Sequence, residues 1–294
     1  MNHSHAGSGV EQKLGIAFAI TVGIFVVELI GGILANSLAL LSDSLHILTD
    51  FLAIELTFIA LRIAKRPHSS TMSFGFHRIE IFAAFANGIT LVAITAWIFY
   101  EAYSRFLHPG TVDTSLVVGF AAIGLVANIA MALLLKKESK DNLNVKGSYM
   151  HILGDLIATV VVIVGAIIMM FVPNTIIDVI ISVGIGVLIL RSGISLCREC
   201  IHIFMEGAPP EIKSDEVAKE MHKLEEIMDI HDLHIWTLTS NVIAMSAHVK
   251  IKQQYMGKAN SILKKINALM QEKFDIDHCT IQIENEDDFI NLDK

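Results

Sequence analysis

Two pairs of ionisable residues with the same spacing occur inside long apolar stretches of this chain. The pairs are His46-x-x-x-Asp50 and His151-x-x-x-Asp155. On a helix, residues four apart lie on one face, about 6 Å apart along the axis. Two such helices, face to face, bring together two imidazole nitrogens and two carboxylate oxygens, which form a tetrahedral ligand set for Zn²⁺. We therefore predict a metal site built from these four residues.

The apolar surroundings make the pairs informative. An aspartate near the middle of a membrane-spanning helix costs roughly 2.5 to 3.5 kcal/mol on insertion scales, so such a residue indicates a functional site by default. The alternative is four isolated polar residues that face a helix bundle and are satisfied by backbone carbonyl groups. Asp43, three residues before His46, either orients the imidazole or lines a water-filled path. We assign no role to Glu28, Glu55 and Glu101.

The composition indicates a membrane protein. Hydrophobic residues make up 53% of the 294 residues and the mean hydropathy is +0.58, whereas soluble domains are about 45 to 50% apolar. The net charge of −8, with acidic residues gathered in the last third, excludes a basic surface for nucleic acid. Three cysteines give no disulfide framework. Residues 1–13 lack the features of a signal peptide, so we expect a cytoplasmic N-terminal tail there.

Six apolar segments are long enough to cross a membrane as helices, which takes about 20 residues. Turn residues separate them, as at Asn36-Ser37 and His108-Pro109-Gly110. Lys and Arg gather in the loops after the second and fourth segments, so the positive-inside rule places both termini in the cytoplasm. The predicted helices are 14–35, 38–63, 79–104, 114–136, 148–171 and 175–198, within a six-helix transmembrane domain at 14–205.

A soluble domain is predicted at 206–294. The composition changes there from apolar to charged, and Gly207-Ala208-Pro209-Pro210 marks the boundary. The order α-β-β-α-β gives a three-stranded sheet with two helices on one face, a ferredoxin-like α+β arrangement. The helices are predicted at 210–225 and 256–273 from apolar spacing, and the strands at 230–238, 242–251 and 279–284 from alternation.

Taken together, these features resemble the cation diffusion facilitator family of metal/proton antiporters. The resemblance is carried by the six helices, the His/Asp pairs on the second and fifth, the stretch from Ser73 to Glu80, and His231-Asp232-Leu233-His234-Ile235-Trp236. It implies a homodimer that is not an enzyme and that exports Zn²⁺ from the cytoplasm in exchange for protons, here across a bacterial inner membrane. Relatives with histidine at the position of His46 tend to prefer zinc, and transport of other divalent transition metals is left open.

The resemblance also implies metal binding in the soluble domain. The residues expected to converge on a regulatory zinc are His234, His248, His278 and Glu284. His231 and Asp232 would add a site at the dimer interface. Strand alternation puts Asp232 and His234 on one face and His231 on the other, so we expect that not all of them share one metal. The alternative is a set of ordinary surface or interface histidines.

Two further features follow from the alignment on Ser73-Phe74-Gly75. The positions of a second metal site found in some relatives hold Ser69, Met72 and Phe76 here, none of which is a zinc ligand. His68 and His77 lie nearby, either as metal ligands or as solvated loop and interface residues.

Arg78 and Glu206 match positions at which related antiporters carry an interlocking basic and acidic residue. We therefore predict a partly desolvated salt bridge between them, stronger than the 0 to about 1 kcal/mol of exposed pairs.

The chemistry of the four intramembrane residues supports an exchange of metal for protons. Zinc needs neutral imidazole and ionised carboxylate, so metal ions and protons compete for the same atoms. An intramembrane zinc hydrolase would instead need an open coordination position and a general base, and no His-Glu-x-x-His occurs. A magnesium channel would use acidic rings or carbonyl filters, and a metal sensor would move no ion.

Overall fold

The structure, a computed structural model, describes residues 4–66, 69–136, 143–172, 174–239 and 242–285. The chain divides into two compact units. The first comprises Met1–Leu56 and Ala86–Leu196, and the second comprises Thr57–Phe85 and Cys197–Lys294.

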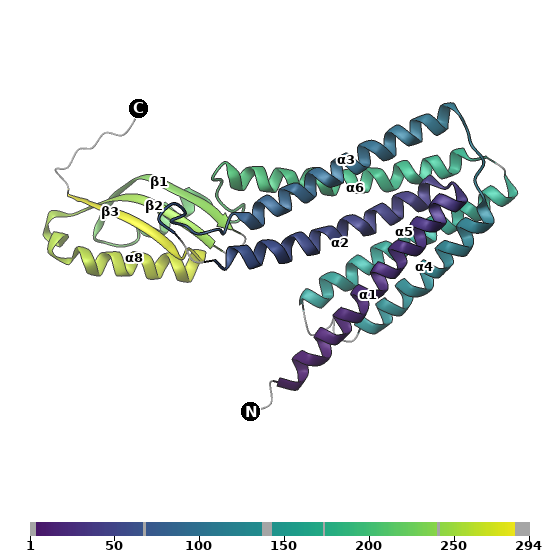
Figure 1. Cartoon of the computed structure of the whole chain (residues 1–294). Helices are drawn as coiled ribbons and strands as arrows, with labels where there is room; N and C mark the ends of the chain where they lie inside the picture. Colours follow the sequence, from purple (N-terminus) through teal and green to yellow (C-terminus); the bar gives the residue numbers. More distant parts are fainter. Residues whose placement is uncertain (1–3, 67–68, 137–142, 173, 240–241, 286–294) are drawn as a thin grey trace. The chain divides into compact units, whose positions relative to one another are not determined.

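Six long helices make up most of the first 204 residues (Figure 1). They are α1 (Ser4–Ala35), α2 (Leu38–Ala64), α3 (Ile79–Leu107), α4 (Thr114–Leu135), α5 (Leu143–Phe171) and α6 (Ile176–Phe204). Their bounds lie close to the predicted ones, except that α1 begins at Ser4 and so takes in most of the segment predicted as a tail.

Five of these helices, all but α2, are long and apolar enough to cross a membrane, judged over the described residues. α2 contains Asp43, Asp50, Glu55 and Arg62, and charged residues lower the hydropathy of a helix. Its 27 residues nonetheless extend about 40 Å, more than the roughly 30 Å of a hydrocarbon core. The helix that carries the first His/Asp pair is therefore long enough to span a membrane, although it is more polar than the others.

The first unit is a helix bundle whose outer surface is apolar. α4 packs against both α1 and α5, and Gly186 of α6 lets the ring of Phe99 on α3 approach closely. Leu40, Ile98 and Ala121 are among the buried residues of its core. Large apolar side chains on the outside, such as Val126 and Leu133, are mostly exposed, as expected for a surface that contacts lipid.

Asp178 of α6 caps the first turn of α2. The hydroxyl of Ser37 donates a hydrogen bond to Oδ1 of Asp178 at 2.6 Å, and the backbone N–H of Leu38 donates to Oδ2 at 2.7 Å. The N–H groups of a first helical turn have no partner within the helix, so a carboxylate stabilises them. Asn36, in the left-handed conformation with φ 51°, makes the sharp turn from α1 that this cap requires.

The second unit contains an α+β domain with a three-stranded sheet. Its elements are α7 (Ser214–Met221), β1 (Ile227–Thr239), β2 (Val242–Ile251), the 3-10 helix η2 (Gln253–Lys258), α8 (Ala259–Phe274) and β3 (His278–Asn285). The strand order is β1-β2-β3, with β1 antiparallel and β3 parallel to β2. α7 is shorter than the predicted 210–225, because a turn between Pro209 and Ile212 comes before it.

Both helices of this domain cover one face of the sheet. Val217 and Met221 of α7 join Ile262 and Ile266 of α8 in one buried cluster with alternate residues of β2, including Val249. The residues of β2 between them, among them His248, therefore lie on the opposite face. That face carries the candidate ligands of the soluble domain.

Candidate metal centres

The two His/Asp pairs meet between α2 and α5 in the first unit. Nε2 of His151 lies 3.1 Å from Oδ2 of Asp50 and 3.8 Å from Oδ2 of Asp155. Nε2 of His46 lies 3.8 Å from Oδ2 of Asp50 and 4.0 Å from Oδ1 of Asp155. Each imidazole therefore faces two carboxylates, one on its own helix and one on the other.

These separations suit a single metal ion. Ligand atoms about 2.0 Å from a tetrahedral Zn²⁺ lie about 3.3 Å from one another, and the observed nitrogen to oxygen distances run from 3.1 to 4.0 Å. The side chains are also reachable from outside the protein, with exposed fractions of 48% for His151 and 16% for Asp155. Binding one ion at all four residues requires the side chains to move closer together, because their ligand atoms do not all lie within 4.8 Å of one another.

Asp43 does not orient the imidazole of His46, which was the first of its two predicted roles. Nδ1 of His46 is buried and has no hydrogen-bond partner among the described residues, while its Nε2 faces Asp50 and Asp155. Asp43 is buried and accepts a hydrogen bond at 3.4 Å from the hydroxyl of Thr159 on α5. The second role, lining a path, stays a prediction.

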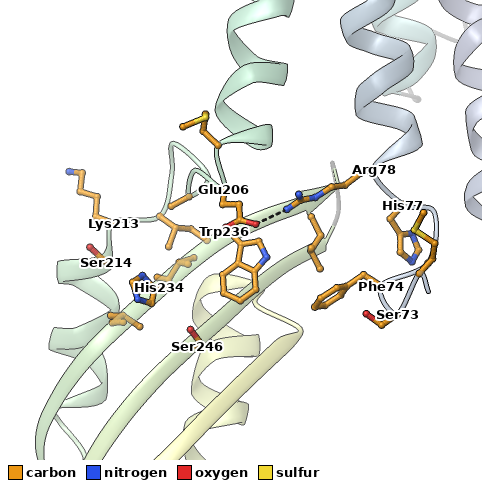
Figure 2. A pocket seen from close by; sticks show the side chains of 18 of the residues that line it. Ser73, Phe74, His77, Arg78, Glu206, Lys213, Ser214, His234, Trp236 and Ser246 are labelled. Atoms are coloured by element: carbon orange, nitrogen blue, oxygen red, sulfur yellow. Dashed lines mark hydrogen bonds and ion pairs between the residues drawn. The ribbon is translucent and has the colours of Figure 1, made fainter. Parts of the chain in front are cut away.

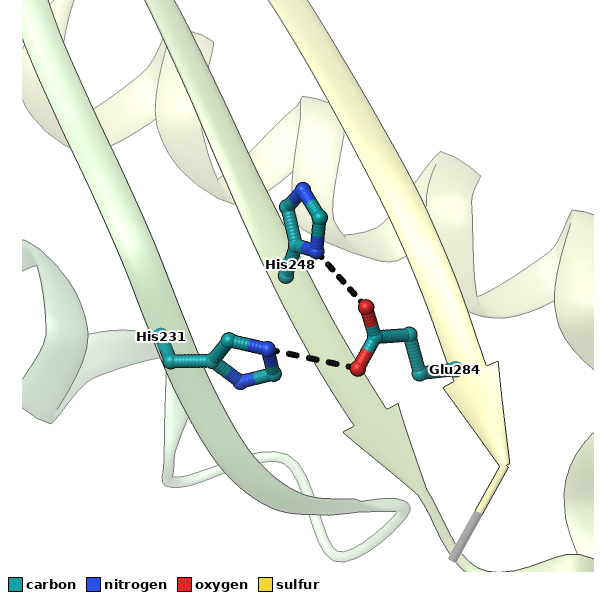
Figure 3. A group of neighbouring side chains, drawn as sticks. All are labelled: His231, His248 and Glu284. Carbon is teal, nitrogen blue, oxygen red and sulfur yellow. Dashed lines mark hydrogen bonds and ion pairs between the residues drawn. The ribbon is translucent and has the colours of Figure 1, made fainter. Parts of the chain in front are cut away.

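A second cluster lies on the sheet of the soluble domain, where His231 of β1, His248 of β2 and Glu284 of β3 converge (Figure 3). Each offers one ligand atom, and these atoms lie within 4.8 Å of one another. Nδ1 of His248 is 2.6 Å from Oε1 of Glu284, and Nε2 of His231 is 3.3 Å from its Oε2. The Glu284 side chain is only 3% exposed, so its carboxylate is held between two imidazole rings.

Two atoms of this cluster are buried without a hydrogen-bond partner among the described residues. They are Nε2 of His231 and Oε2 of Glu284, which are near enough for an ion pair but form no hydrogen bond. Buried polar atoms without partners cost free energy, and a cation between these two would satisfy both. Two imidazoles and one carboxylate also supply three of the four ligands of a tetrahedral zinc, so the cluster fits a bound metal.

The predicted separation of His231 from the other ligands was wrong. The pairing of β1 with β2 shifts register between His231 and His234, and Asp232 has a left-handed backbone with φ 50°. Such a bulge interrupts the alternation of side chains. His231 and Asp232 therefore both approach His248, whose Nε2 lies 3.7 Å from Oδ2 of Asp232. Asp232 also contacts Nε2 of His234 at 2.8 Å.

His278 does not join this cluster, so its predicted convergence was wrong. It pairs with Ala244 of β2, whereas Glu284 pairs with Lys250. Six residues along a strand span about 20 Å. His278 is also exposed at the first position of β3.

Arg78 and Glu206 lie within salt-bridge distance, but in an exposed setting (Figure 2). Nη2 of Arg78 is 3.5 Å from Oε1 of Glu206, and the two side chains are 37% and 68% exposed. Both line an open cavity of about 1230 Å³ within the second unit, together with His234 and Trp236. The predicted desolvation of this pair is therefore wrong, and its expected contribution falls to the 0 to about 1 kcal/mol of surface pairs.

In the loop between α2 and α3, the aligned positions Ser69, Met72 and Phe76 bring no zinc ligand. His77 is exposed. His68, the other histidine predicted near this loop, lies outside the described residues.

Sequence reasoning missed two buried carboxylates. Glu28 of α1 is 0% exposed, and Asp178 of α6 is buried in its contact with α2. A lone acid in an apolar stretch was itself a signal. Neither residue belongs to a repeated pair, so the sequence named no partner for it.

Family models match two consecutive parts of the chain. Residues 14–205 match a family model described as cation efflux transmembrane domain, and residues 209–286 match one described as cation efflux protein, cytoplasmic domain. A protein of Bacillus velezensis named cadmium, cobalt and zinc/H(+)-K(+) antiporter is 38% identical over 286 residues, which are 96% of this chain and 91% of that protein. Zinc transporter ZitB of Escherichia coli is 34% identical over 96% of this chain and 92% of its own length.

Among the solved structures that match is the metal-bound C-terminal domain of the CzcD transporter from Cuprividus metallidurans. It is 33% identical and covers 25% of this chain and 99% of its own, with a TM-score of 0.23. That TM-score is too low to bear on the fold.

Proposed function

The chain belongs to the cation diffusion facilitator family of metal cation efflux transporters, and we propose that it exports Zn²⁺ from the cytoplasm in exchange for protons. The observation that carries this proposal is the meeting of four side chains from α2 and α5. In this set each nitrogen of His46 and His151 that faces the site lies 3.1 to 4.0 Å from an oxygen of both Asp50 and Asp155. The names of both relatives given above include zinc.

Exchange follows from the protonation chemistry of this set. Zinc binds neutral imidazole and ionised carboxylate, so each bound proton lowers the affinity for the metal. When the set faces the cytoplasm, where protons are scarcer, it loads zinc. When it faces the opposite side, protons bind the same atoms and displace the metal. Alternating access to one set of ligands therefore couples the two flows.

The ligand types also suit transport rather than storage. Mixed nitrogen and oxygen ligands hold zinc less tightly than four thiolates and lose affinity on protonation. The partial exposure of His151 leaves a route by which the ion can leave. His46 supplies a borderline ligand that favours zinc over harder cations, and other divalent transition metals remain candidate cargo.

The arrangement of the chain that we propose follows from its apolar segments and charges. Six helices within 14–205 cross the bacterial inner membrane, both termini lie in the cytoplasm, and residues 206–294 form a ferredoxin-like domain. Loops rich in Lys and Arg after α2 and α4 support this orientation. The resemblance to dimeric antiporters supports a homodimer as the working unit.

In the cytoplasmic domain, His231, His248 and Glu284 would hold a zinc ion that regulates transport. The two unpartnered buried atoms described above support this role. When bound there, the metal would bridge three strands and stabilise the domain, and His231 would keep its ring turned towards the buried carboxylate. This regulatory zinc ion would not itself be transported.

The test of the proposed function is flux in proteoliposomes of the full chain. A zinc gradient should drive proton movement in the opposite direction, read with a pH-sensitive dye inside the vesicles. Substituting cadmium, cobalt, manganese or nickel for zinc in turn measures the range of cargo. Zinc movement with no proton movement would contradict exchange, and no movement of any metal would contradict transport.

A further inference from the structure

Glu28 is a buried carboxylate that the four-ligand set does not use. It lies in α1 with 0% of its surface exposed, and neither of its side-chain oxygens has a hydrogen-bond partner among the described residues. An ionised carboxylate buried without a partner is so costly that the group takes up a proton instead. Glu28 therefore has the properties of a proton-binding group.

Glu28 packs tightly against α4. A methyl group added at Gly124 would overlap Oε1 of Glu28, so the absence of a side chain at Gly124 makes room for the carboxyl group. No residue of α4 from Thr114 to Leu135 is charged, so α4 supplies no counter-ion. The tight fit leaves little space for a large hydrated cation on that side, whereas a proton needs none.

A polar chain passes close by and leads to the metal ligands. Asn128 lies four residues after Gly124, on the same face of α4. Its Nδ2 is 3.5 Å from the hydroxyl of Thr159 on α5, and that hydroxyl lies 3.4 Å from Oδ2 of Asp43 and 2.9 Å from the backbone oxygen of Asp155. The groups that act on Glu28 electrostatically are the carboxyl groups of Asp43 on α2 and Asp155 on α5, so neither of them is a counter-ion.

From these contacts we propose that Glu28 is a proton-binding site, separate from the metal ligands, that releases its proton when zinc binds. Before zinc binds from the cytoplasmic side, burial without a partner and the nearby carboxyl groups of Asp43 and Asp155 keep Glu28 protonated. A Zn²⁺ ion bound at Asp155 reverses the sign of the nearby charge and favours the ionised carboxylate. The O–H bond of Glu28 then breaks, the electron pair stays on the carboxylate, and the proton leaves for the water that the site faces.

This role rests on the proposed exchange of zinc for protons and adds a carrier to it. The four ligands exchange protons by direct competition with the metal for the same atoms. Glu28 exchanges one through the electric field, with no contact to the metal. Its loss should therefore remove about one proton per zinc bound and leave the metal ligands in place.

The deciding measurement is zinc binding to the purified full-length protein in detergent at several pH values. For the wild type, the slope of log Kd against pH gives the number of protons released. In Glu28→Gln the magnitude of that slope should be smaller by about one, which means one proton fewer released, while zinc still binds. Glu55→Gln, which changes an exposed carboxylate of α2, should keep the wild-type slope. An unchanged slope in Glu28→Gln would overturn the assignment.

A second pair of variants leaves Glu28 in the chain and protects the test against misfolding. Gly124→Ala pushes a methyl group into the carboxyl group, whereas Gly119→Ala places one on the same helix with nothing within 4 Å. Gly124→Ala should reduce the slope and Gly119→Ala should not. Equal slopes in the two would also overturn the proposal.

Proteoliposomes of the wild type separate failure of this role from failure of the proposed exchange. If a zinc gradient drives no proton movement in the wild type, the exchange itself is wrong and the role of Glu28 falls with it. If the wild type exchanges the two ions and Glu28→Gln moves as many protons per zinc, only the role of Glu28 is wrong.

Discussion

The two ligand clusters of this chain are built from similar residues but differ in how freely their atoms can be reached. In the transmembrane set the side chains of His151 and Asp50 are 48% and 32% exposed, and the four residues come from only two helices. In the set on the sheet the Glu284 carboxylate is 3% exposed and is held between histidines from two other strands. An open set suits an ion that must enter and leave, whereas a closed set suits an ion that stays. The same chemistry can therefore serve as cargo site or structural site, depending on burial.

The comparison is tested most severely by removing one ligand from the open set. Asp50→Ala or Asp155→Ala deletes one of four bonds to the cargo, and we expect zinc flux in proteoliposomes to fall by more than about 100-fold, since loss of a supporting residue alone costs 10- to 100-fold. The protein should stay folded, because an intramembrane carboxylate is costly to insert. Glu55→Ala on the same helix is the matched control. Flux near the wild-type level in either aspartate variant would refute the assigned cargo site.

In the closed set, a similar change should leave transport largely intact. Glu284→Gln removes the buried charge shared by His231 and His248, and we expect the affinity of this site for zinc to fall by at least about 10- to 100-fold. Calorimetry on the full chain should then count one zinc fewer per protomer at micromolar metal. His278→Ala, at the far end of the same strand, should keep the wild-type count. An unchanged number of bound zinc ions in Glu284→Gln would show that this cluster on the sheet does not bind zinc.

Selectivity sharpens the comparison further. His46→Asp exchanges a borderline nitrogen ligand for a hard oxygen, so cadmium or manganese should gain several-fold relative to zinc in flux assays. The same type of exchange in the closed set, His248→Asp, should leave the relative fluxes unchanged because no cargo passes there. Equal selectivity of His46→Asp and the wild type would mean that residues beyond the four ligands select the metal.

The smallest effect is expected at the exposed pair of Arg78 and Glu206. Their coupling in a double-mutant cycle of transport rates should stay below about 1 kcal/mol, a factor of roughly five. The fold-loss of transport in the double variant should accordingly be close to the product of the losses in the two single variants. A coupling several times larger would indicate that this pair is desolvated in some working state of the transporter.

The sequence predicted the elements of the fold well because apolar periodicity and helix length are local properties. Six helices and the order α-β-β-α-β appear at their expected places, although α1 begins ten residues earlier and α6 ends six residues later than predicted. The first set of ligands was also predictable, since the i, i+4 spacing on two helices fixes which side chains share a face. The same holds for β2, whose bounds Val242–Ile251 match the alternation.

What the sequence could not give depends on tertiary contacts. The bulge at Asp232 reverses the facing of His231, and nothing in the local pattern distinguishes a bulged strand from a regular one. His278 and Glu284 lie on one strand, and only the register shows which of them reaches His248. Glu28 carries no spacing signal, because its surroundings are set by α4 and not by its own helix.

The cap that Asp178 places on α2 has a mechanical consequence. Because Asp178 holds the Leu38 end of α2 in place, a tilt of the helix moves its other end the most. Asp50 lies about 18 Å and Ala64 about 39 Å along the helix from Leu38. A tilt of about 10° therefore moves these residues by about 3 Å and 7 Å. A shift of 3 Å is as large as the spacing between ligand atoms. A modest tilt of this one helix is therefore enough to assemble or dismantle the proposed cargo site.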